Sequence, residues 1–178
     1  GTLRLPAQFQ LVCAMNPCKC GWRGQPSGKC TCSDKEVEKY VQKISGPLLD
    51  RIDIQIEIVP VPFEKISEQR QGESSAAIRQ RVIKARQIQE ERFACYPGTY
   101  CNAQMTSKQL SAFAQPETKG LSLLKSAMER LNLSARAYDR ILKVSRTIAD
   151  LEGSGQIKPE HLAEAISYRN LDRENWAG

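Results

Sequence analysis

Four of the seven cysteines in the chain form two Cys-x-Cys pairs, Cys18 with Cys20 and Cys30 with Cys32. The segment between the pairs is polar and rich in glycine, which favours turns that bring the second pair back toward the first. Four thiolates placed in this way suit tetrahedral zinc and leave no position open for water, so the predicted site is structural. A pair of disulfides or a redox or iron–sulfur centre is the alternative, since single-residue spacers are less common in zinc knuckles.

The other cysteines and the single histidine carry no predicted chemistry. Cys13 lies in an apolar run and is expected to be a small buried hydrophobic residue. Cys95 and Cys101 lie in a loop without two further metal ligands, so they stay unassigned. His161 has glutamates one residue before it and three residues after it, which predicts a solvated helix face.

Two arginines occupy positions that suit a phosphate partner. Arg51 lies between Asp50 and Asp53 at a turn, where pairing with either aspartate is the simple alternative. Arg136 follows the expected helix cap Ser134, and a cation in the first helical turn opposes the helix dipole by about 0.3–1 kcal/mol. An anion at the helix start would remove this penalty, because the free N–H groups and the arginine would both bind it.

The helix that begins at Ser134 carries further positive charge on one face. Arg140 and Lys143 follow Arg136 at spacings of four and seven residues, which places all three side chains together. The face fits contact with phosphate or DNA, and salt bridges to Asp139 or Glu129 are the alternative.

A family resemblance is carried by four parts of the chain, residues 5–21, 45–53, 134–151 and 165–169. They contain Leu-Pro-Ala-x-Phe, Ala-Met-Asn-Pro-Cys-x-Cys-Gly, Ser-Gly-Pro-Leu-Leu-Asp-Arg-Ile-Asp and Ser-Arg-Thr-Ile-Ala-Asp-Leu. On these motifs, essentially the whole chain resembles the C-terminal half of the magnesium-chelatase-like AAA+ ATPases of the ComM (YifB) type. The resemblance implies an α+β fragment: the late strands of an AAA+ α/β core with a four-cysteine insertion, then an all-α helical lid.

The resemblance also implies roles for three residues. Asn16 would be sensor 1, which orients the attacking water, and Arg51 would be an arginine finger that reaches the nucleotide of the neighbouring subunit. Arg136 would be sensor 2, which contacts the γ-phosphate bound in its own subunit. ATP, Mg²⁺ and a homo-hexamer follow, because an arginine acting in trans needs a subunit on each side. The Walker A pattern G-x-x-x-x-G-K-[ST] and an acidic Walker B strand are absent from the sequence, so both are expected upstream of Gly1 and this chain alone is expected not to hydrolyse ATP.

The hydrophobic pattern predicts the elements that must position these residues. Apolar runs predict buried strands over residues 9–15 and 52–58, the second with isoleucine at every other position. A period of 3.6 residues predicts the helices, over residues 37–44, 74–93, 106–113, 121–131, 134–152 and from 159 onward. The expected domains are residues 1–60 (the core part, with a zinc-binding insertion at 18–32), a linker at 61–73 and the helical lid at 74–178.

Composition and charge limit the classes of protein to which the chain can belong. The 178 residues carry a net charge of +6, which permits contact with DNA or nucleotide phosphate, and no apolar run is long enough to span a membrane. The chain starts without Met or a secretory segment, so it is expected to be a cytoplasmic piece of a longer protein.

The resemblance suggests a hexameric DNA helicase or branch-migration ATPase that acts in DNA uptake and recombination. The alternatives are a magnesium chelatase I-type ATPase that remodels a metal-insertion partner, which the cysteine insertion disfavours, and a zinc-stapled nucleic-acid-binding module without enzymatic activity.

Overall fold

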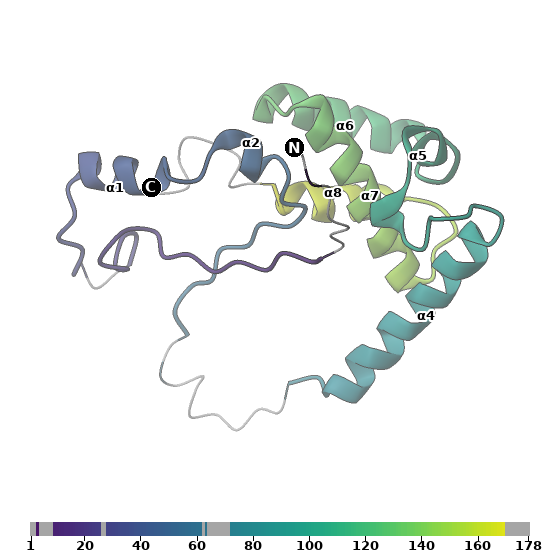
Figure 1. The fold of residues 1–178 in the computed structure, drawn as a ribbon, viewed down its shortest axis with the longest axis horizontal. Coiled ribbons are helices and arrows are strands. Elements are labelled where there is room, and N and C mark those ends of the chain that lie inside the picture. The colour runs from purple at the N-terminus through teal and green to yellow at the C-terminus, as the bar shows by residue number, and fades with distance from the viewer. Residues whose placement is uncertain (1–2, 4–8, 26–27, 62, 64–71, 170–178) are drawn as a thin grey trace. The chain divides into compact units, whose positions relative to one another are not determined.

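The computed structural model describes residues 3, 9–25, 28–61, 63 and 72–169. The chain divides into two compact units, of which the first extends to Ile44 and the second begins at Ser45 (Figure 1). The described residues are mostly helical, in the order α1 (Asp34–Val41), α2 (Gly46–Leu49), α4 (Ser75–Phe93), the 3₁₀ helix η1 (Asn102–Gln104), α5 (Ser107–Phe113), α6 (Thr118–Leu131), α7 (Ala135–Glu152) and α8 (Pro159–Ser167).

The first unit holds the cysteine segment and α1. The backbone N–H of Ser33 donates to the Glu36 carboxylate at 3.0 Å, as in a capping box, and this bond lowers the pKa of Glu36. Val37 is the buried residue of the helix. The amphipathic helix predicted here is therefore confirmed, with Ser33 as its cap.

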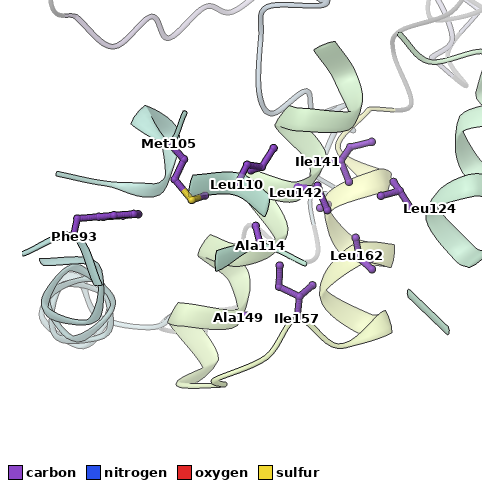
Figure 2. Close-up of a cluster of buried hydrophobic side chains, with 11 residues drawn as sticks. Phe93, Met105, Leu110, Ala114, Leu124, Ile141, Leu142, Ala149, Ile157 and Leu162 are labelled. Atoms are coloured by element: carbon purple, nitrogen blue, oxygen red, sulfur yellow. The ribbon is translucent and has the colours of Figure 1, made fainter. Parts of the chain in front are cut away.

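The second unit is built around α7. Helices α4, α5 and α8 pack against α7, and α6 packs against α8. Their apolar faces form one buried cluster, part of which Figure 2 shows, made of Phe93, Met105, Leu110, Ala114, Leu124, Ile141, Leu142, Ala149, Ile157, Leu162 and Ala165. The predicted helical lid is thus present as a packed helical unit.

Local capping signals set the helix ends in the second unit. The side chains of Ser74, Thr106 and Ser134 each accept a bond from a backbone N–H in the first turn of the helix that follows. Helices α6 and α7 end at Asn132 and Gly153, which adopt the left-handed conformation with φ of 43° and 77°. These starts and stops agree with the helices predicted from the sequence.

Helix α4 is buried along only part of its length. Ala85 and Gln89, in its second half, are buried, whereas Ile78 and Val82 are 42% and 46% exposed. In Figure 1 the C-terminal end of α4 reaches the other helices of the unit and its N-terminal half extends away from them. The buried residues of α4 therefore all lie in its second half.

The two predicted strands are not formed. Residues 9–15 and 52–59 have no regular secondary structure, and the one β-bridge among the described residues joins Pro116 to Ile157. Within 52–58 the predicted orientation is also wrong, because Gln55 is buried while Ile54 and Ile56 are 52% and 62% exposed. A strand needs a neighbour for its backbone N–H and C=O groups. This segment pairs with no strand among the described residues and is bonded at single points instead, such as the Gln55 N–H to Tyr168 O at 2.9 Å and Ile52 O to Arg169.

Candidate phosphate-binding and metal sites

The four predicted zinc ligands converge in the first unit. The Sγ atoms of Cys18, Cys20, Cys30 and Cys32 all lie within 4.8 Å of one another, with 3.3 Å between Cys18 and Cys20 and 3.8 Å between Cys18 and Cys30. Tetrahedral zinc with Zn–S bonds near 2.3 Å needs sulfur atoms about 3.8 Å apart. The thiols are not joined in disulfides. The donor set fits one tetrahedral metal ion such as zinc.

Backbone turns position the cysteines of this cluster. Gly21 has a φ of 80°, which glycine adopts without strain, and its N–H donates to Cys18 O at 3.1 Å. The backbone N–H of Trp22 stabilises the thiolate of Cys20 and lowers its pKa to about 6. Cys13 is exposed, so the expectation of a buried residue is wrong, because the apolar run around it does not pack as a strand.

Asn16 lies just before the cysteine cluster. Its amide group lies beside the turn at Gly21, since a Cβ added to that glycine would be 3.6 Å from Asn16 Nδ2. The predicted sensor 1 residue therefore sits in the first unit, whereas Arg51 and Arg136 sit in the second.

In the second unit, the three predicted cations line one recess. Arg136, Arg140 and Lys143 surround a volume of about 210 Å³ at the start of α7, which is also lined by Asp53, Ala103 and Asp139. Arg136 is exposed, and within the described part of the chain it forms no ion pair with Asp139 or Glu129. The structure therefore brings the three residues together, as their spacing predicted.

The other two cations of the recess, Arg140 and Lys143, each have a bonding partner in the same chain. Arg140 forms an ion pair with Asp53, with side chains 28% and 50% exposed. Lys143 Nζ donates to Ala103 O at 2.9 Å, and burial, together with the neighbouring Arg140, lowers the pKa of Lys143.

Arg51 lies on a segment that is held against the ends of α7 and α8. Ser134 Oγ donates to Asp50 Oδ2 at 3.1 Å, Arg169 donates to Ile52 O, and the Gln55 N–H donates to Tyr168 O at 2.9 Å. The Arg51 side chain itself is exposed and donates to Pro47 O at 2.8 Å. Neither flanking aspartate pairs with it, so the simple alternative of a local salt bridge does not occur.

A buried ionic network at the centre of the second unit was missed by sequence reasoning. The Asp150 carboxylate is fully buried and accepts bonds from Arg92, Asn102 and Arg146 at 2.5–3.1 Å. Arg146 also donates to the backbone carbonyls of the turn after α7, and its burial lowers its pKa. The i, i+4 spacing of Arg146 and Asp150 on a helix is the one signal that could have indicated the pair. The conspicuous Ser-Arg-Thr-Ile-Ala-Asp motif therefore has a structural role here.

The predicted solvated position of His161 is wrong. This residue is buried rather than solvated, because α8 packs against α7. Its Nδ1 accepts the Lys158 backbone N–H at 3.1 Å, and its Nε2 bonds to the Glu152 carboxylate. The histidine caps the start of α8 and ties it to the end of α7.

Comparison with known proteins shows the family of the chain. The family described as magnesium chelatase, subunit ChlI, matches residues 1–66, and its C-terminal family matches residues 72–169. The chain belongs to the magnesium chelatase ChlI family. It is 41% identical over 177 residues to competence protein ComM of Haemophilus influenzae, covering 96% of this chain and 32% of that protein. An uncharacterized protein YifB of Escherichia coli is 41% identical over 170 residues, covering 94% of this chain and 32% of YifB. An uncharacterized protein of Mycobacterium tuberculosis is 35% identical over 169 residues, covering 95% and 33%.

This ChlI-family chain is a ComM-type member of the AAA+ proteins. It spans about a third of the length of the curated relatives that it matches. Within the described ranges, no helix has the length and apolar character to cross a membrane.

Proposed function

We propose that this chain supplies phosphate-sensing residues to an ATP-driven AAA+ motor. Asn16 acts as sensor 1, Arg51 as an arginine finger toward the nucleotide of a neighbouring subunit, and Arg136 as sensor 2 toward the γ-phosphate in its own subunit. The observation that carries the proposal is the recess at the start of α7, where Arg136 is exposed beside two further cations. The cation sits where the helix N–H groups also favour an anion, so phosphate would be bound by both.

Arg51 supports the proposal from the neighbouring segment. An arginine that reaches a phosphate in trans must keep its guanidinium accessible while its backbone is held in place. Arg51 is exposed, and the residues on either side of it are bonded to the ends of α7 and α8. Such an arginine contributes about 10³- to 10⁵-fold in rate, or about 4–7 kcal/mol of transition-state stabilisation.

The remaining parts of the ATP site come from outside this chain in the proposed motor. The sequence holds no Walker A or Walker B motif, so the phosphate cradle and the Mg²⁺ ligands are supplied elsewhere and the chain alone does not hydrolyse ATP. The domain plan is a core part at residues 1–60, a linker at 61–73 and a lid at 74–178. The two family matches end and begin at 66 and 72, which supports a linker there.

The proposed motor is a homo-hexameric DNA helicase or branch-migration ATPase that works in DNA uptake and recombination. The similarity to a protein named for competence and the net charge of +6 support a DNA partner. The four cysteines hold one structural zinc ion, which fixes a loop with little apolar surface of its own.

A second candidate is a chelatase-type ATPase that remodels a metal-insertion partner, which the description of the matching family favours. The two candidates differ in what stimulates ATP hydrolysis. Duplex or branched DNA should stimulate a helicase, with salt dependence from its phosphate contacts. Lack of any stimulation by DNA would favour the chelatase-type motor.

The experiment that tests the arginine finger is Arg51→Ala in the intact ATPase. We expect hydrolysis to fall by at least about 10³-fold while nucleotide affinity is unchanged, because the finger stabilises the transition state. Arg79→Ala, which removes another exposed arginine from α4, is the matched control and should retain activity. Full hydrolysis by the Arg51 variant would remove the finger assignment.

A further inference from the structure

The recess at the start of α7 already contains an anion from the same chain. Its three cations face two carboxylates, Asp53 and Asp139. Asp53 is bound directly to the Arg140 guanidinium. The charges in the recess therefore sum to about +1, and one of the three cations is paired with a carboxylate before any ligand arrives.

Asp53 also belongs to the segment that carries Arg51. That segment has other anchors to the same unit, through Asp50 to Ser134, through Ile52 O to Arg169 and through the Gln55 N–H to Tyr168. Of these anchors, the Asp53–Arg140 pair alone uses a cation that lines the recess. Loss of that pair would loosen the segment at one point and leave the other anchors in place.

We infer that Asp53 is an internal competitor for the phosphate group that the recess binds. A terminal phosphate that enters beside Arg136 takes over the Arg140 guanidinium, and Asp53 is released. Occupancy of the recess thereby loosens the hold on the Arg51 segment. The inference rests on the proposed function, since it takes the recess as the site of the γ-phosphate.

The shape of the recess favours the end of a polyphosphate over a nucleic-acid backbone. Its volume of about 210 Å³ is bordered by α7, η1 and the Asp53 segment, and all three cations line this one small volume. A duplex backbone presents charges in a row every few ångströms and is better matched by cations spread along a surface. The ligand class is therefore a nucleoside triphosphate or its polyphosphate end.

The test is titration of the 178-residue chain with tripolyphosphate and with ATP, followed by calorimetry and NMR at low salt. An exposed ion pair is worth about 0.2–1 kcal/mol, so removal of the competitor should tighten binding by up to about fivefold. Asp53→Asn should therefore bind tripolyphosphate about two- to fivefold more tightly than the unmodified chain. A merely structural salt bridge would give the opposite sign, because its loss would disorder the recess.

Two controls separate competition from a general change in charge. Glu73→Gln also removes one exposed carboxylate that pairs with an arginine, Arg81, but neither residue lines the recess, so the affinity should be unchanged. In an Arg140→Gln background, Asp53→Asn should lose most of its effect, because the cation for which the two anions compete is gone.

The outcomes distinguish this inference from the proposed function. If Arg136→Ala weakens tripolyphosphate binding but Asp53→Asn does not tighten it, the competitor role is wrong and the phosphate site stands. If Arg136→Ala leaves tripolyphosphate binding unchanged, or if neither the unmodified chain nor Asp53→Asn binds tripolyphosphate, the competitor role and the proposed phosphate site are both wrong. If duplex DNA displaces tripolyphosphate and Asp53→Asn strengthens only the DNA complex, the polyphosphate assignment is overturned.

Discussion

Replacement of Asp150 by asparagine removes the central charge of the second unit with almost no change in shape. The buried carboxylate accepts two bonds from Arg92, at 2.7 and 2.5 Å, one from Asn102 at 2.7 Å and one from Arg146 Nε at 3.1 Å. In asparagine one oxygen becomes an NH₂ donor that faces these N–H donors. Arg92 and Arg146, which are 13% and 3% exposed, would lose their counter-charge.

The expected loss of unfolding free energy follows from the burial of the Asp150 carboxylate and its arginine partners. Loss of one partner of a buried ion pair destabilises a protein by about 3–5 kcal/mol, because a charge is left unpaired in a medium of low polarity. A domain has a total free energy of unfolding of about 5–15 kcal/mol, so Asp150→Asn should remove a large share of it. Glu73→Gln is the matched control, since Glu73 also accepts two bonds from one arginine, Arg81, at 2.7 and 3.0 Å. Those side chains are 44% and 50% exposed, so its loss should be at most about 1 kcal/mol.

Urea unfolding followed by circular dichroism measures both variants. The free energy of unfolding should fall by at least about 3 kcal/mol for Asp150→Asn and by at most about 1 kcal/mol for Glu73→Gln, with the same m-value. If Asp150→Asn stays within about 1 kcal/mol of the unmodified chain, or if the two variants lose equal amounts, burial does not control the strength of this network and the reasoning is refuted.

Three further predictions concern separate parts of the chain. Gly120→Ala should destabilise the second unit by about 1–3 kcal/mol in the same urea assay, because its methyl group would lie 2.6 Å from the buried Leu162 Cδ1; an unchanged midpoint would show that α6 can move aside. Bonds from His161 and from the neighbouring lysine lower the pKa of Glu152 to about 2, so their stabilisation is present above about pH 4.5 and is lost as the pH falls toward 2. Glu152→Gln should flatten that part of the stability–pH curve, and a curve of unchanged shape would contradict the assignment. Metal analysis should find one zinc per chain, lost in a Cys30→Ser variant, and retention of zinc by that variant would show that the four thiolates are not the ligands.

The sequence by itself determined the helices of the second unit and the four cysteines that converge in the first. Ser74, Thr106 and Ser134 cap helices in the structure, and Gly153 ends one, because capping needs only atoms two or three residues apart. The cysteine pairs converge for a related reason, since each pair spans three residues and the loop between them can turn at glycine. The shared face of Arg136, Arg140 and Lys143 also follows from helical spacing alone.

Tertiary structure decided which side chains are buried and which partners they have. The alternating isoleucines after Arg51 predicted a buried face, yet Gln55 is buried and Ile54, Ile56 and Ile58 are exposed, because burial depends on which surfaces the segment meets. His161 and Asp150 are buried because α8 and α4 pack against α7, and no local pattern specifies those contacts.

The same distinction applies to the candidate phosphate site. The sequence indicated its cations, but Asp53 pairs with Arg140 from 87 positions away and Asp50 with Ser134 from 84 positions away. Electrostatic pairing depends on distance in space, and the folded chain sets that distance only after its helices have packed. The sequence therefore determined which residues could bind phosphate, and the tertiary structure decided which of them are already bound to carboxylates of the same chain.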